Sequence, residues 1–259
     1  MTQLRKDLIK TLLKGIETGD PASVAVVNEA KYIQHNPQTH EGSEGLATLF
    51  ARLAKTNPRV NIVRIFSDGD FVFGHTEYDF STRRVGFEVF RFEGDQAVEH
   101  WDNIQPRPTV EENPSGNSMI DGPTEATDLN LTEDNRLLVQ NFVQQIFVEG
   151  SHDQIGVYLP TNDQDFVQHS PRLGDGSTAL MASLQATNKE GQRLIRYDTI
   201  HRVLAEGNFV LVVSEGYLDQ VHTSFYDLYR VENGLIVEHW ETIEAVPPKS
   251  EWKNNNGKF

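Results

Sequence analysis

The sequence contains no cysteine, and this absence excludes several kinds of chemistry at once. Without a thiol there is no disulfide framework, no thiolate nucleophile and no cysteine-based metal site. The redox compartment of the protein is therefore left open by its composition.

Positive charge is also scarce in this chain. Lys and Arg number 23 against 38 Asp and Glu, which gives a formal net charge of −15. Nucleic-acid binding depends on clustered Lys and Arg, so no nucleic-acid partner is expected. The acidity is typical of a soluble, self-repelling surface.

Long apolar runs are missing as well. No stretch approaches the roughly 20 apolar residues of a membrane span, so no membrane partner is expected. The opening segment MTQLRKDLIKTLLKGIETGD lacks the uninterrupted apolar region and the cleavage site of a signal peptide. We therefore expect a cytoplasmic protein.

What the sequence does contain is an internal repeat. Residues 32–46 read YIQHNPQTHEGSEGL, and residues 166–180 read FVQHSPRLGDGSTAL, an offset of 134 (166 − 32 = 134). A second motif, VEHWD at 98–102, recurs as VEHWE at 237–241, where the offset is 139 (237 − 98 = 139). Two matching anchors at nearly constant separation indicate a duplicated domain, and 259 residues suffice for two.

In the first copy, helical patterns come before strand patterns. An apolar stripe from Leu4 to Ile16 predicts a helix, Asp20 can cap a second one, and a third begins at Gly42-Ser43. The alternating pattern that follows predicts hairpin-linked strands over 60–67, 71–81, 84–92 and 97–105.

The second copy repeats this order. The pattern predicts helices over 132–149, near 152–159 and over 176–189, and strands over 193–205, 208–219, 222–231 and 235–244. Helices followed by hairpin-linked strands indicate an α+β fold and not a parallel β-α-β design.

Composition also predicts where the two domains begin and end. The stretch rich in Pro, Glu, Ser, Asn and Gly between the copies is typical of a linker. We expect a first domain over 1–108, a linker over 109–130, a second domain over 131–247 and a flexible tail over 248–259.

Several His and carboxylate residues recur in both copies and could form an acid/base site. Residues two apart in a strand share a face, so His100 and Asp102 point to the same side. If His35 and His75 converge with them inside an aromatic wall, burial would raise the pKa of a carboxyl and lower that of an imidazole, which brings an acid/base pair near neutrality. The corresponding candidates in the second copy are His169, His239 and Glu241.

Other interpretations stay open for the same residues. His35 and His169 could instead cap the following helix or pin the loop through hydrogen bonds to backbone. Trp101 could be a packing residue and not a substrate platform. Asp102 could form an ordinary salt bridge to an Arg such as Arg64.

The sequence contains nine His, a common metal ligand, so a metal site is one possible interpretation. Three His and one carboxylate could form one in space, but no His-x-x-x-His motif occurs, and we expect no metal. There is no P-loop and no GxGxxG motif. The Gly-Ser pairs at 42–43 and 176–177 precede helices and are typical of caps, not of nucleophile elbows.

Three motifs of the first copy together suggest a family. They are YIQHNP at 32–37, the pattern Arg64-Ile65-x-x-x-Gly69-Asp70-x-Val72, and VEHWDNIQ at 98–105. This combination resembles the SnoaL-like polyketide cyclase family, in the branch described as predicted SnoaL-like aldol-condensation-catalysing proteins. The resemblance extends over each copy almost end to end.

The resemblance implies the cone-shaped α+β fold shared with nuclear transport factor 2 and ketosteroid isomerase. In that fold a strongly bent antiparallel sheet wraps around helices and encloses an apolar pocket. In the characterised cyclases an acidic residue is the acid/base for an aldol closure, without a metal or organic cofactor. By motif position Asp102 would take this role, with His35 and His75 orienting it or relaying protons. The implied ligand is an apolar or carbonyl-containing small molecule.

The second copy departs from the pattern. Glu241 replaces Asp102, and Val213 falls where His75 would align. Because a misplacement of about 1 Å can cost roughly two orders of magnitude in rate, we expect the first copy to be chemically more complete.

Two further questions concern assembly and activity. We expect the two copies to pair within the chain as a pseudo-dimer, since a tandem chain supplies the partner at high effective concentration. The sequence leaves a larger homo-oligomer open. It also leaves open a non-catalytic binding protein or a pure association module, because this fold hosts enzymes and binders alike.

Overall fold

The computed structural model describes residues 2–259, apart from the side chains of Pro21 and Ser43, and it divides into two compact units. Unit 1 extends to Pro106 and includes Pro247–Phe259, whereas unit 2 is Arg107–Val246. None of the described helices is long and apolar enough to cross a membrane.

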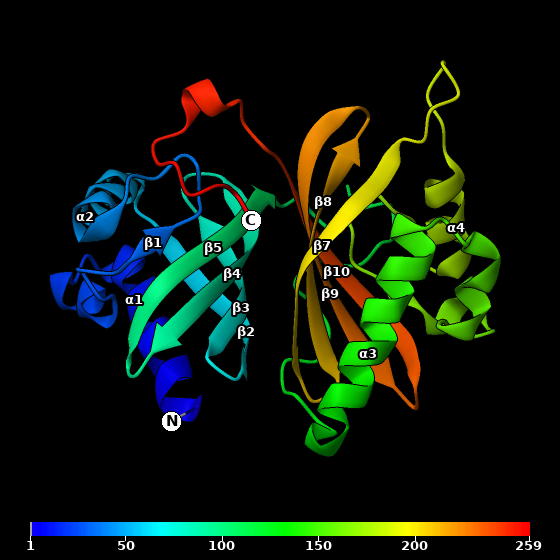
Figure 1. The fold of residues 1–259 in the computed structure, drawn as a ribbon, viewed down its shortest axis with the longest axis horizontal. Helices are drawn as coiled ribbons and strands as arrows, with labels where there is room; N and C mark the ends of the chain where they lie inside the picture. Colours follow the sequence, from blue (N-terminus) through cyan, green and yellow to red (C-terminus); the bar gives the residue numbers. More distant parts are fainter. Residues whose placement is uncertain (1) are drawn as a thin grey trace. The chain divides into compact units, whose positions relative to one another are not determined.

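Unit 1 is a five-stranded sheet with helices along one face (Figure 1). Its order in the sheet is β1-β5-β4-β3-β2, antiparallel except for the parallel pair β1–β5. The elements are α1 (Thr2–Thr18), η1 (Pro21–Val26), β1 (Ile33–Gln34), α2 (Gly42–Leu53), η2 (Ala54–Thr56), β2 (Arg59–Asp68), β3 (Phe71–Asp79), β4 (Arg83–Glu93), β5 (Gln96–Pro106) and, near the end of the chain, η7 (Lys249–Glu251).

Unit 2 repeats this plan with the sheet order β6-β10-β9-β8-β7. Its elements are η3 (Leu129–Leu131), α3 (Thr132–Phe142), the π-helical turn η4 (Val143–Val148), η5 (His152–Val157), η6 (Asp163–Asp165), β6 (Val167–Gln168), α4 (Ser177–Gln185), β7 (Ile195–Glu206), β8 (Phe209–Leu218), β9 (Val221–Glu232) and β10 (Leu235–Ala245). The predicted α+β class with two repeated sheets is confirmed.

Each unit has a separate apolar core between its helices and one face of its sheet. In unit 1 the stripe of α1 packs Leu12, Leu13 and Ile16 into a cluster that includes Val72 and Phe90. Fully burying such a side chain stabilises the fold by about 1.5–3 kcal/mol. The period of the stripe therefore decides which face of α1 meets the sheet.

The segments after the two sheets differ from the expected linker and flexible tail. We call residues 107–121, which follow β5 but belong to unit 2, the first strap, and residues 247–259, which follow β10 but belong to unit 1, the second strap. Both bury side chains, because Met119 and Lys258 are each only 2 % exposed. Figure 1 shows the second strap, in red, running past β1 and ending beside β5.

Composition cannot reveal such straps, because they contain little apolar surface. Their Asn side chains hydrogen-bond to backbone and thereby hold a chain that is mostly outside helices and strands. The same polar, Pro- and Gly-containing composition is typical of a mobile linker.

Gly216 of β8 provides a test of the second sheet. A Cβ atom at this position would lie 2.0 Å from the backbone oxygen of Arg196, whereas one at Gly74 of β3 would lie 3.5 Å from the nearest backbone oxygen. We expect Gly216→Ala to destabilise the protein by about 1–3 kcal/mol, as overpacking does, and Gly74→Ala by less than about 1 kcal/mol. Denaturant unfolding of the two variants measures this, and equal losses would contradict the close approach of β7 and β8.

Candidate functional site

The four predicted candidates of unit 1 do not form one cluster. His100 and Asp102 lie on the helix-covered face of the sheet, whereas His35 and His75 lie on the opposite face. His35 stacks on Trp101 of β5 with ring centroids 4.6 Å apart, and strand alternation places Trp101 opposite its neighbours 100 and 102. The structure thus separates the candidates into two groups with different surroundings.

The helix-side group is completed by Glu88 of β4, which sequence reasoning missed. Glu88 is paired in register with Asp102, and its Oε2 lies 2.7 Å from His100 Nε2. The Tyr78 hydroxyl donates to Glu88 Oε1 at 2.6 Å. Asn36 donates through Nδ2 to Asp102 Oδ2 at 2.7 Å. Ligand atoms of Glu88, His100 and Asp102 all lie within 4.8 Å of one another.

The hydrogen bonds fix the tautomer of His100. Gln34 Oε1 accepts from the backbone N–H of Asn36 at 2.9 Å and lies 3.0 Å from His100 Nδ1. An amide oxygen only accepts, so His100 Nδ1 carries a hydrogen. The remaining ring nitrogen therefore shares a single proton with Glu88, either as an imidazolium–carboxylate pair or as an imidazole–carboxylic acid pair.

Burial sets the acidity of this group. Desolvation raises the pKa of Glu88, which outweighs the opposing hydrogen bond and charge of His100. Desolvation also raises the pKa of Tyr78 well above its ordinary value, with the Glu88 charge adding to the effect. The Tyr78 phenol therefore stays protonated and remains a hydrogen-bond donor.

Unit 2 contains the same group at equivalent strand positions. Asp227 of β9 pairs in register with Glu241 of β10, and Asp227 Oδ1 lies 3.0 Å from His239 Nε2. Gln168 Oε1 accepts from the backbone N–H groups of residues 169 and 170 and lies 3.0 Å from His239 Nδ1, which fixes the same tautomer. Tyr197 donates to Asp227 Oδ2 at 3.0 Å, and burial raises the pKa of Asp227.

The tyrosine that donates a hydrogen bond to Glu88 or to Asp227 lies on a different strand in each copy. Tyr78 of β3 pairs with Val60 of β2, and at the corresponding ladder position Gly216 of β8 pairs with Tyr197 of β7. The tyrosine has thus changed strand, with Val60 opposite Tyr78 and Gly216 opposite Tyr197. The carboxylates are exchanged in the same manner, because β4 and β5 carry Glu and Asp whereas β9 and β10 carry Asp and Glu.

A second phenol lies beside each group. The hydroxyls of Tyr32 in unit 1 and Tyr229 in unit 2 are buried and have no hydrogen-bond partner among the described residues. Desolvation raises the pKa of both well above the ordinary value, and the nearby carboxylates Glu88 and Asp102, or Asp227 and Glu241, raise it further. Each site therefore has a free phenol that can donate to a bound molecule.

The opposite face holds the straps. His35 Nδ1 donates to the Gly257 carbonyl at 3.1 Å, and its Nε2 lies 2.9 Å from Glu99. In unit 2, His169 Nδ1 donates to the Ser118 carbonyl at 2.6 Å, and its Nε2 lies 2.9 Å from a carboxylate oxygen of β10. This arrangement agrees with the alternative in which these His pin a segment through its backbone.

His75 has no counterpart in the second copy. Arg64 donates to His75 Nδ1 at 3.0 Å, and the imidazole stacks on Phe87 at 4.4 Å. The corresponding ladder position in unit 2 is Val213, as the alignment of the copies predicts. His75 therefore lies away from Asp102, on the face of the sheet that carries His35.

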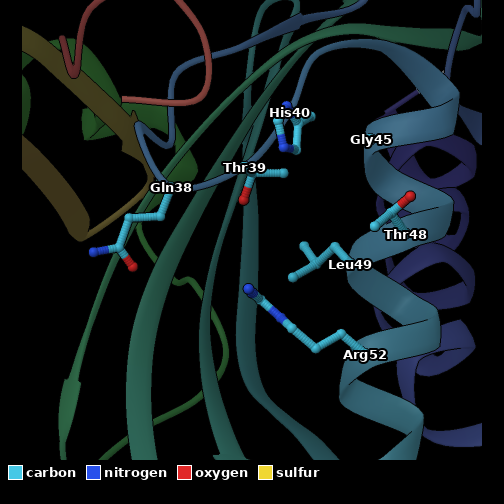
Figure 2. Close-up of a pocket in the computed structure, with 7 residues that line it drawn as sticks. All are labelled: Gln38, Thr39, His40, Gly45, Thr48, Leu49 and Arg52. Atoms are coloured by element: carbon cyan, nitrogen blue, oxygen red, sulfur yellow. The ribbon is translucent and has the colours of Figure 1, made fainter. Parts of the chain in front are cut away.

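A hollow of about 50 Å³ opens on unit 1 (Figure 2), and none of the residues that line it belongs to the group of Glu88, His100 and Asp102. It lies between α2 and the loop after β1, and Leu49 and Arg52 extend from the helix across from Thr39. Gln38, also on this loop, donates its backbone N–H to Asn36 Oδ1, and Asn36 in turn donates to Asp102. The hollow is smaller than the roughly 300–1,000 Å³ of sites that enclose a drug-sized ligand.

The missed carboxylates do have a signal in the sequence. Glu88 and Asp227 are separated by the same 139 residues (227 − 88 = 139) as the two VEHW motifs, and each interrupts an aromatic-rich strand. Applying the second offset to every acidic residue would have found the pair. Tyr78 and Tyr197 could not be found this way, because they occupy different strands.

Comparison with family models gives a match to one part of the chain. Residues 9–100 match the family model described as SnoaL-like domain, which confirms the resemblance in unit 1. No curated protein matches the chain.

Solved structures similar to parts of the chain have low sequence identity to it. TsrD from Streptomyces laurentii is 18 % identical over 40 % of this chain and 89 % of that chain, with a TM-score of 0.36. A putative polyketide cyclase from Bacillus cereus ATCC 10987 is 15 % identical over 39 % and 74 %, with a TM-score of 0.36. An epoxide hydrolase from M. tuberculosis is 19 % identical over 40 % and 84 %, with a TM-score of 0.36.

The raised pKa of Glu88 predicts a pH-dependent stability difference. A carboxyl whose pKa is higher in the folded than in the unfolded state stabilises the fold at low pH, and this contribution disappears as the pH rises through the folded pKa. We therefore expect Glu88→Gln to become more stable relative to the wild type as the pH rises above about 4.5, by about 1.4 kcal/mol per unit of pKa difference.

Denaturant unfolding between about pH 4 and pH 8 measures this change. Asp227→Asn should behave in the same way, since burial raises the pKa of Asp227 too. Glu93→Gln is the control with the opposite sign, because hydrogen bonds from Lys31 and Arg91 lower the pKa of Glu93. A pH-independent difference for Glu88→Gln would show that this carboxyl is not desolvated.

Proposed function

Since the first unit of the chain carries a SnoaL-like domain, we propose that each unit performs acid/base chemistry on a carbon next to a carbonyl group. The observation that supports this is the buried group of two carboxylates and one imidazole in both units. Both units have the same three chemical groups, although Glu and Asp are exchanged between the two strands and the bonded tyrosine comes from a different strand.

The roles follow from the hydrogen bonds. Asp102 has one oxygen, Oδ1, without a hydrogen-bond partner among the described residues, and this atom is the candidate base. It would remove the proton from the α-carbon of a carbonyl compound. The proton shared by His100 and Glu88 would move to the carbonyl oxygen, so that an enol forms and charge does not build up in the buried site.

The enol then has two fates that the site can support. It can attack a second carbonyl carbon, which forms a carbon–carbon bond as in an aldol closure. It can also be protonated at another carbon, which is an isomerisation. The unpartnered Tyr32 hydroxyl would donate to the substrate oxygen in either case.

Unit 2 supports the same roles with Glu241 as base and the pair of His239 and Asp227 as proton donor. Burial raises the pKa of Glu241, but the Arg172 charge, the His239 charge and the hydrogen bond from Ser170 outweigh it, so that the pKa is lowered. A lowered pKa keeps Glu241 ionised at neutral pH, as a base requires. We therefore propose activity for both units, and not for the first alone.

The second candidate function is a binding protein for a carbonyl-containing metabolite. It is favoured by the unpartnered hydroxyls of Tyr32 and Tyr229, because a hydrogen bond to a ligand oxygen requires no base. The unpartnered phenols would then hold a ligand oxygen without any reaction.

Exchange of α-protons for deuterium separates these functions. With a panel of ketones and β-keto esters, we expect the wild type to catalyse exchange, followed by NMR. Because each unit has its own base, Asp102→Asn or Glu241→Gln should each remove one part of the rate. The double variant should lower the rate by roughly 10²–10⁴-fold, the usual contribution of a positioned base.

Controls identify the alternative outcomes. Glu93→Gln, an exposed position, should leave the rate unchanged. Ligand binding in a thermal-shift screen without proton exchange would favour the binding protein. If no compound binds, an association module remains, and the double variant should then resemble the wild type in every assay.

A further inference from the structure

The two straps are equivalent segments of the repeat. Asn117 and Asn256 are 139 residues apart (256 − 117 = 139), which is the offset of the two VEHW motifs. Asn256 Nδ2 donates to the Gln34 carbonyl at 3.0 Å and to a Glu41 carboxylate oxygen at 2.7 Å.

Asn117 makes the equivalent contacts in unit 2. Its Nδ2 donates to the Gln168 carbonyl at 3.1 Å and to Asp175 Oδ1 at 3.3 Å. Residues 168 and 175 correspond to 34 and 41 through the offset of the first motif, which is 134. Each strap therefore docks in the same place, beside the two-residue strand of the unit that it covers.

The docked straps place different residues beside the second carboxylate of each site. In unit 1 the Lys258 Nζ donates to the Asp102 backbone oxygen at 2.8 Å and lies 3.6 Å from Asp102 Oδ1. The Lys258 side chain is only 1 % exposed. At the equivalent strap position unit 2 has Met119, which carries no charge.

In unit 2 the positively charged residue beside the equivalent carboxylate lies outside the strap. Arg172, in the loop after β6, lies with its Nη2 at 3.2 Å from Glu241 Oε1. The equivalent residue in unit 1 is the neutral Gln38, since the first motif has an offset of 134 (172 − 38 = 134). Each site therefore pairs one cation with the same carboxylate, from the strap in one unit and from the loop in the other.

We propose that Lys258 is a positioning residue of the first site and the counterpart of Arg172 in the second. A buried ammonium is costly unless it is paired, so Lys258 has a specific electrostatic partner in Asp102. Through this partner it orients the candidate base and balances its charge. The first site is thus complete only when the second strap is docked.

The expected effect of Lys258 on kcat rests on the proposed function, whereas its expected effect on the pH dependence of stability does not. Among the described residues, the ionisable groups around Asp102 include Glu88, His100, Tyr32, Tyr78 and Lys258. Of these, the strap contributes Lys258.

The decisive variant is Lys258→Met, which gives unit 1 the residue that unit 2 has at this position. A charge role predicts that its loss in unfolding free energy is larger at about pH 7 than at about pH 3, where carboxylates are protonated. A role in packing or in the hydrogen bond to the Asp102 backbone predicts an equal loss at both pH values. Asn254→Ala is the matched control, because its amide donates to the backbone oxygens of Asn36 and Thr39 and to no carboxylate, and its loss should be equal at both.

The rescue variant is Lys258→Met with Gln38→Arg, which rebuilds the arrangement of unit 2 in unit 1. We expect it to recover most of the stability lost at pH 7. In a Glu241→Gln background, where only the first site reacts, Lys258→Met should lower kcat by roughly ten- to hundredfold with little change in KM, and Gln38→Arg should restore it. In an Asp102→Asn background, Lys258→Met should leave the second site's rate unchanged.

The proposed function and the proposed role of Lys258 can be contradicted independently of each other. If the wild type catalyses no exchange, the proposed function is wrong, while the pH dependence of stability still tests Lys258. Equal losses at pH 7 and pH 3, together with no recovery by Gln38→Arg, would overturn the role of Lys258. If Lys258→Met alone does not fold, recovery of folded protein by Gln38→Arg supports the proposal, and failure to recover it counts against it.

Discussion

The constraint on which the rest of the structure depends is the burial of two carboxylates within 4.8 Å of each other in each unit. Removing a charge from water is costly, and two like charges at this distance repel each other in a medium of low dielectric constant. Each neighbouring element contributes an interaction that offsets this cost. Strand β4 or β9 brings its carboxylate to an imidazole, a tyrosine donates a hydrogen bond, and a lysine or an arginine faces the other carboxylate. The short strand β1 or β6 contributes the glutamine that fixes the imidazole tautomer.

The two copies satisfy this constraint with different residues. The bonded phenol is Tyr78 in one and Tyr197 in the other, and the cation is Lys258 in one and Arg172 in the other. Position-by-position comparison of the repeat therefore makes the second copy look incomplete, since Glu241 stands where Asp102 would be. In space the longer carboxylate of β10 faces the shorter Asp227 of β9, so the pair has the same total length in both units.

Much of the fold could be predicted from the sequence, because periodicity reports directly on which side chains are buried. The strand expected over 84–92 is Arg83–Glu93, and the helix expected from Gly42 begins there. The site could be predicted only in part. Alternation places His100 and Asp102 on one face, but His35 directly follows β1, whose parallel register with β5 aligns Gln34 with His100. Nothing in a single sequence reveals that register, and so the sequence alone does not place His35 on the face opposite Asp102.

The straps have a consequence for the order in which the protein is made. Unit 2 is a continuous stretch, Arg107–Val246, whereas unit 1 needs Pro247–Phe259 in addition to its first 106 residues. During synthesis from the N-terminus, all of unit 2 has therefore left the peptidyl-transferase centre before the strap of unit 1 is translated. The unit that is translated first is the one completed last, and until then the face of β5 that carries His35's partner Glu99 lacks the segment that docks on it. The tandem arrangement makes the first site depend on a segment that is translated after the whole of unit 2.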